Sequence, residues 1–157
     1  MTYTEAIEYI MSRRKFQKSS GHERIERLLS LLGDPHKNLK FVHIVGTNGK
    51  GTVCTCLSEI LTCAGYTTGL FTSPFIVKFE ERIRVNGEFI SEEELCEITQ
   101  LVKEKTLLIE QEDLHPTVFE TILAIALVYY KRKGCSIVLY NWKLWIKWNI
   151  FPNKNVC

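Results

Sequence analysis

The stretch "FVHIVGTNGKGTV", residues 41 to 53, joins a β-branched run to a glycine-rich turn that ends in Lys-Gly-Thr. The β-branched run predicts a buried strand, and apolar residues at helical spacing from Val53 to Ala64 predict a helix after the turn. A second strand, "TTGLFT", is expected at 67–72. Strand, turn, helix and strand make a β-α-β unit, which implies a parallel sheet with a right-handed crossover.

The turn has the composition of an anion cradle, although its spacing is not Gly-x-x-x-x-Gly-Lys-Ser/Thr. Ile44 stands where that pattern requires a glycine, and Gly51 separates Lys50 from Thr52. The three glycines of the turn let backbone N–H groups point at an anion, and the start of the following helix adds positive potential. The alternative is that these glycines serve only a tight turn. Three glycines, a lysine and a hydroxyl within seven residues favour a nucleotide site.

Helices and strands alternate along the rest of the chain, as in an α/β protein. Ser91 with Glu94, and Thr117 with Glu120, are spaced as capping boxes at the starts of two helices. Further elements are expected as helices at 3–11, 22–33, 91–105 and 117–130 (the last closed by Gly134), a hairpin at 84–90 around Asn-Gly, and a third buried strand at 135–140.

Bulk composition narrows the class of protein. The 157 residues, 45% hydrophobic and 24% charged, fit one globular domain. A net charge of +2 argues against a nucleic-acid partner, and the basic cluster at 13–18 is interpreted as a solvated face. The apolar stretch at 117–130 is too short to span a membrane and contains Glu120. Six cysteines without a Cys-x-x-Cys pair or a leader pattern predict reduced, buried thiols in a cytoplasmic protein.

The motif "GTNGKGT" at 46–52 resembles the nucleotide loop of the folylpolyglutamate synthase and dihydrofolate synthase family, relatives of the Mur ligases. The lead-in at 21–52, "LFTSPFIVKFEERIRVNGEFIS" at 70–91 and "PTVFETILAIALVYY" at 116–130 are also similar to this family, so the resemblance runs from residue 1 to about 139. It implies a P-loop-type parallel sheet flanked by helices, as in the central ATPase domain of Mur ligases, in truncated form.

The resemblance also implies an activity. In the family, ATP phosphorylates a carboxylate of the pterin substrate, and the amine of L-glutamate displaces the phosphate to form an amide. The acceptor is a folate, dihydropteroate, or both. The matching positions that would hold the triphosphate, with Lys50 also catalytic, are Asn48, Gly49, Lys50, Gly51 and Thr52.

Two further positions are implied as magnesium ligands, Ser73 in "TSP" and Glu120 in the Phe-Glu helix. Each has an alternative: Ser73 before Pro74 organises a turn, and Glu120 is only the capping partner of Thr117. A hydroxyl and a carboxylate are suitable oxygen ligands for magnesium, and with the family pattern present the metal role is favoured for both. Two arginines, at 82 and 84, are left without a role.

Beyond residue 139 the sequence leaves the family, which continues with an acidic residue and a glycine-rich loop. Residues 140–157 contain no Asp, Glu or Gly, and apolar residues alternate along them. The segment is expected to be an off-family tail to a ligase-domain portion at 1–139. An amphipathic strand or a base-stacking surface are the alternatives. Self-association through this tail is expected, and the alternative function is nucleotide binding without catalysis.

Overall fold

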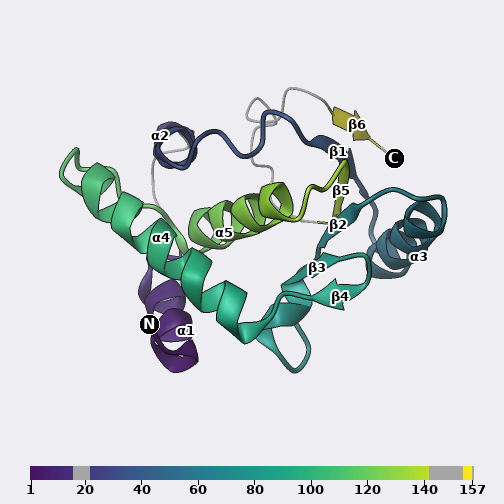
Figure 1. Cartoon of the computed structure of the whole chain (residues 1–157), viewed down its shortest axis with the longest axis horizontal. Coiled ribbons are helices and arrows are strands. Elements are labelled where there is room, and N and C mark those ends of the chain that lie inside the picture. Colours follow the sequence, from purple (N-terminus) through teal and green to yellow (C-terminus); the bar gives the residue numbers. More distant parts are fainter. Residues whose placement is uncertain (16–21, 142–153, 157) are drawn as a thin grey trace. The chain divides into compact units, whose positions relative to one another are not determined.

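The computed structural model describes residues 1–15, 22–141 and 154–156, and its elements gather into two compact units (Figure 1). Unit 1 consists of Met1–Pro35 and Ser91–Tyr129, and unit 2 of His36–Ile90 and Tyr130–Cys157. None of the helices in the described ranges combines the length and hydropathy that crossing a bilayer requires.

Unit 1 is helical. It contains α1 (Tyr3–Ser12), α2 (Glu23–Leu31), α4 (Glu92–Glu110) and most of α5 (Val118–Arg132). Helices α1 and α2 each pack against α4. Apolar residues at spacings of three and four supply the packed faces, as an amphipathic helix requires. The fully buried members include Ala6, Ile10, Ile25, Leu28, Leu29, Leu95, Ile98, Val102 and Ile109.

Local side-chain signals mark the ends of these helices. The Ser91 hydroxyl accepts from the Glu94 N–H at 3.2 Å. At the start of α5, the Thr117 hydroxyl accepts from the Glu120 N–H at 3.3 Å, and the Glu120 carboxylate accepts from the Thr117 N–H at 2.7 Å. Gly134, with φ of +67°, follows the end of α5. These contacts confirm the caps at both predicted helix starts and the predicted end of α5.

Unit 2 contains a sheet of six strands within the described residues, in the order β4-β3-β2-β5-β1-β6. Strands β2, β5, β1 and β6 are parallel, β3 pairs antiparallel with β2, and β4 pairs antiparallel with β3. The α/β class is confirmed, but β5 lies between the two strands of the predicted β-α-β unit. The strands are β1 (Lys40–His43), β2 (Thr68–Phe71), β3 (Ile83–Val85), β4 (Glu88–Phe89), β5 (Ile137–Tyr140) and β6 (Lys154–Val156). The predicted alternating pattern runs from Tyr140 to Ile150; Tyr140 ends β5, and residues 142–150 lie outside the described residues.

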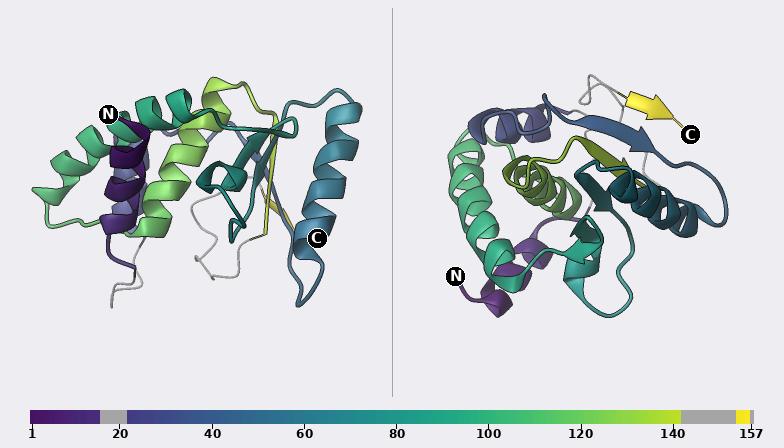
Figure 2. Two further views of the ribbon diagram at one scale, coloured as in Figure 1. Left: turned by 90° about the horizontal axis from the view of Figure 1, so that it is seen from below. Right: turned by 45° about the vertical axis from the view of Figure 1, so that its right-hand side comes forward.

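Helix α3 (Lys50–Cys63) packs against β2 and β5 (Figure 2). The residues that it buries match the predicted face only in part. Cys54 and Ser58 are buried, whereas Val53 and Ile60 are 51% and 63% exposed. Leu57 and Leu61 of the predicted stripe are half-buried and pack against the core, so the apolar pattern was right only in part. The small side chains at 54 and 58 let the helix approach the sheet closely, and hydrophobicity alone does not reveal that geometry.

Among the described cysteines, five are free thiols, and only some are buried. Burial raises the pKa of Cys54 to about 11 and that of Cys135 to about 12, so both stay protonated at neutral pH. Cys56 and Cys63 are exposed on α3, which corrects the prediction that they are buried.

Gly69, in β2, is expected not to tolerate a side chain. A Cβ there would lie 2.9 Å from the Tyr130 ring and 3.1 Å from Val138, and the Tyr130 hydroxyl is anchored to the Leu70 carbonyl at 2.8 Å. We predict that Gly69→Ala lowers the free energy of unfolding by about 1–3 kcal/mol because the core is overpacked. Urea titration, monitored by circular dichroism, measures the free energy of unfolding of the variant and of the wild type. Gly51→Ala in α3, where the nearest atom is 3.8 Å away, is the control and should cause no loss.

Candidate nucleotide-binding site

The predicted phosphate turn lies between the end of β1 and the start of α3. Gly49 is the N-cap of α3 and has φ of +77°, a left-handed conformation that favours glycine. No side chain caps this 14-residue helix, and its first turn carries no acidic residue. No capping side chain therefore accepts hydrogen bonds from the first N–H groups of α3. Helix termini that bind anions have such N–H groups available for the ligand.

Lys50 folds back over the turn. Its Nζ donates to the carbonyl oxygens of Gly46 and Thr47, and its side chain is half-buried. The ammonium group thus lies against the backbone that is predicted to surround phosphate. The predicted nucleotide residues are contiguous here, in the turn and the first turn of α3: Asn48, Gly49, Lys50, Gly51 and Thr52.

Ser73 lies just after β2 and has two polar partners. Its backbone N–H donates to Oδ1 of Asn141 at 3.2 Å, and its hydroxyl accepts from the Arg82 guanidinium at 3.1 Å. Asn141 follows β5 and is 7% exposed. Its Nδ2 would lie 3.8 Å from a Cβ built on Gly51. Asn141 is therefore hydrogen-bonded to Ser73 and lies near Gly51 at the start of α3, both within unit 2.

Asn141 and Arg82 were not assigned a role from the sequence. The signal for Asn141 is a polar residue directly after a buried strand, at the carboxyl edge where α/β sheets bind ligands. Arg82 stacks over the rings of Phe75 and Phe79 at 4.9 and 5.8 Å, and burial lowers the pKa of its guanidinium below its ordinary value. Its Nε has no hydrogen-bond partner among the described residues. No sequence pattern distinguishes it from a solvated strand arginine.

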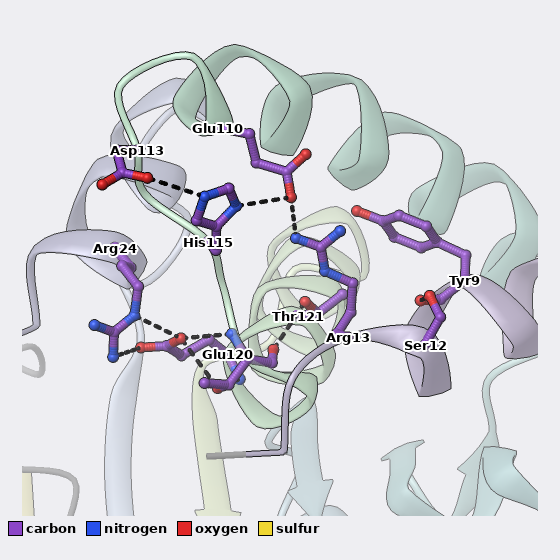
Figure 3. A network of polar contacts seen from close by, with 10 residues as sticks. Tyr9, Ser12, Arg13, Arg24, Glu110, Asp113, His115, Glu120 and Thr121 are labelled. Atoms are coloured by element: carbon purple, nitrogen blue, oxygen red, sulfur yellow. Dashed lines mark hydrogen bonds and ion pairs between the residues drawn. The ribbon is translucent and has the colours of Figure 1, made fainter. Parts of the chain in front are cut away.

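Glu120 belongs to unit 1 and is already engaged (Figure 3). Beside the Thr117 N–H and hydroxyl, its carboxylate accepts from Nε and Nη2 of Arg24 at 3.3 and 3.2 Å. The two ion-paired side chains are only 11% and 10% exposed. Glu120 therefore makes the hydrogen bonds of the predicted capping box. It also pairs with a buried arginine, Arg24, which the sequence did not predict.

The donor groups at these positions do not fit a preformed magnesium site. Arg82 donates to the hydroxyl of Ser73, and Arg24 to the carboxylate of Glu120, so each predicted ligand already faces a cation. The neighbour that the Ser73 backbone N–H contacts is the side-chain amide of Asn141, whereas carboxylates are the protein groups that usually bind magnesium. Across the described ranges, no three His, Cys, Asp or Glu residues gather closely enough to hold a metal ion by themselves. The metal roles of Ser73 and Glu120 stay predictions.

Curated relatives share this sequence over most of its length, although no protein-family model matches it. Folylpolyglutamate synthase of Lacticaseibacillus casei is 36% identical over 141 residues, which are 88% of this chain and 33% of that protein. Dihydrofolate synthase/folylpolyglutamate synthase of Bacillus subtilis is 40% identical over 129 residues, 82% of this chain and 30% of that protein.

Solved structures show similarity to the same group of proteins. A complex of folylpolyglutamate synthase with AMPPCP and folate has a TM-score of 0.85 at 35% identity and covers 92% of this chain and 36% of its own. The folylpolyglutamate synthase of Thermotoga maritima gives 0.81 at 38% identity, over 90% of this chain and 33% of its own. The chain spans about a third of the length of these relatives. It is therefore homologous, over most of its own length, to a portion of the folylpolyglutamate synthase and dihydrofolate synthase family, as its motifs predicted.

Proposed function

We propose that the turn at 46–52 binds the triphosphate of ATP, in a chain descended from ligases that join glutamate to folates. One observation carries the proposal: the uncapped start of α3, entered through left-handed Gly49, lies beside the ammonium of Lys50. Backbone N–H groups, helix dipole and lysine then act together on one anion. That relatives have been solved with AMPPCP supports the proposal.

In the proposed reaction, ATP breaks its β–γ phosphoanhydride bond and a carboxylate oxygen of folate or dihydropteroate gains the phosphoryl group. The amine of L-glutamate then attacks the acyl carbon, phosphate leaves, and the amine loses a proton. This chemistry depends on positioning and charge neutralisation. Lys50 would neutralise the β- and γ-phosphates, while Asn48 and Thr52 would orient them. Arg82 is a second cation, which bonds to Ser73; Ser73 in turn bonds to Asn141, whose side chain lies near Gly51.

Isothermal titration with ATP, ADP and adenosine tests the nucleotide proposal. If the phosphates are the recognised groups, affinity should fall in the order ATP, ADP, adenosine. Each titration is run with magnesium and with EDTA. Because each predicted metal ligand faces an arginine, little magnesium dependence is expected. Equal affinity for ATP and adenosine would contradict the phosphate site, whereas a strong requirement for magnesium would support Ser73 and Glu120 as ligands.

A second candidate function is nucleotide binding without ligation. One observation favours it: each predicted metal ligand, Ser73 and Glu120, already accepts a hydrogen bond from an arginine. The proposal places either function in the cytoplasm, where ATP, folates and glutamate meet.

We therefore predict that the purified 157-residue chain ligates no glutamate to dihydropteroate or tetrahydrofolate. Amide formation needs both reactants held at near-attack distance, which usually requires closure around them. The chain is incubated with ATP, the acceptor and radiolabelled glutamate, and chromatography of the folates then measures how much glutamate has been ligated. A full-length relative serves as the positive control. Product formed by the 157-residue chain would show that this portion suffices and would reject binding without catalysis.

A further inference from the structure

The loop at 72–78 connects β2 to the short 3-10 helix Phe79–Arg82 and exposes apolar side chains at its tip. Ile76 is 89% exposed and Val77 is 76% exposed. Neither residue lies in a helix or a strand. Their backbone N–H groups nevertheless have partners, and a single side chain provides them.

That side chain is Glu81. One of its carboxylate oxygens accepts from the Ile76 N–H at 2.7 Å, and the other accepts from the N–H groups of Val77 and Lys78 at 3.1 and 3.0 Å. Hydrogen bonds from the backbone of Ile76 and Lys78 hold the pKa of Glu81 below its ordinary value of 4.5. The carboxylate is therefore ionised at neutral pH, and the three bonds are charge-assisted.

The main chain of Glu81 and its neighbour Arg82 hold the other end of the loop. The Thr72 hydroxyl donates to the Glu81 carbonyl at 3.1 Å, and the Thr72 N–H donates to the Arg82 carbonyl at 3.0 Å. The next residue, Ser73, accepts from the Arg82 guanidinium. Residues 81 and 82 thus contact both the beginning and the tip of the loop.

We propose that Glu81 is a positioning residue, whose carboxylate fixes the tip of the 72–78 loop and thereby the place of Ser73 beside Asn141. Its importance for ligand binding rests on the proposed function; the positioning itself does not. A plain helix cap would explain only the bond to Lys78, three residues before Glu81. The bonds to Ile76 and Val77 reach beyond any cap.

Amide hydrogen exchange tests the proposal without any nucleotide, so its outcome is independent of ATP binding. Glutamine keeps one acceptor oxygen and loses the charge, so Glu81→Gln should speed exchange at Ile76, Val77 and Lys78 by about tenfold. Glu81→Ala, which removes both oxygens, should do at least as much. Glu88→Gln, at an exposed carboxylate in β4, is the matched control and should change none of the three.

Two results would overturn the proposal. The first is unchanged exchange at 76–78 in both Glu81 variants. The second is unchanged exchange of the Ser73 N–H, which is bonded to Asn141, because the loop tip would then not position Ser73.

A pH titration followed by NMR separates positioning from simple capping. The pKa of Glu81 in the folded protein is lowered below 4.5, so its three charge-assisted bonds are fully present above pH 4.5. They are lost when the pH falls through the folded-state pKa and the carboxylate is protonated. The amide proton shifts of Ile76, Val77 and Lys78 should move together with one midpoint, and Glu81→Gln should abolish that midpoint. Movement of Lys78 alone would support a cap and reject the positioning role.

Discussion

Replacing Glu120 with glutamine is expected to lower the free energy of unfolding by about 3 kcal/mol, near the lower end for breaking a buried ion pair. The change removes the negative charge that Glu120 places against the guanidinium of Arg24, whose side chain is only 11% exposed. Glutamine retains an oxygen for the Thr117 N–H, which keeps the loss from being larger. Thermal or urea unfolding of the two proteins measures the difference.

The matched control for this variant is Glu112→Gln. Glu112 pairs at 2.8 Å with Arg27, which lies on α2 as Arg24 does, but both side chains of this pair are 43% exposed. Solvent screens such a pair, so no resolvable change in stability is expected. If Glu120→Gln unfolds like wild type but loses a magnesium dependence of ATP binding, the structural explanation fails and the metal-ligand hypothesis is supported.

Lys50→Ala is expected to weaken ATP binding by about 1.5 kcal/mol, which is roughly tenfold. Charge-assisted bonds to phosphate are worth about 1.5–3 kcal/mol each. The lower value is expected because Lys50 must first give up its bonds to the Gly46 and Thr47 carbonyls. Calorimetric titration with ATP measures the change, and equal affinity in the variant would reject the phosphate-turn hypothesis.

Lys40→Ala makes the same charge change at the other end of β1. Lys40 is exposed and begins the strand, whereas the turn follows the strand's last residue. A similar loss of affinity in both variants would point to general electrostatic attraction. A loss confined to Lys50→Ala would locate the phosphate at the turn.

Local signals in the sequence predicted the ends of most elements because the interactions responsible span three or four residues. The box of Thr117 and Glu120 and the cap at Ser91 are of this kind. So is the β3-β4 hairpin, where Asn86 and Gly87 both adopt positive φ, as a tight hairpin turn requires. Each depends on backbone geometry that its own residues determine.

Contacts between distant segments were not predictable in the same way. Arg24 and Glu120 are 96 residues apart, and Asn141 meets Ser73 across 68. Residue spacing within a single helix or strand does not predict such pairs. The same limit explains why β5 was not expected between β1 and β2. Adjacency in a sheet depends on how the whole chain crosses over, whereas the pattern of each strand shows only that it is buried.

The cysteines of unit 2 give the protein an internal chemical reporter. A thiol-reactive reagent would modify exposed Cys56 and Cys63 in the folded state, whereas Cys54 and Cys135 are shielded and stay protonated. Alkylation of the shielded pair therefore registers opening of the sheet unit. Loss of the Arg24–Glu120 pair acts on the helical unit instead. Pulsed alkylation read by mass spectrometry would thus show whether the two units unfold together or in sequence.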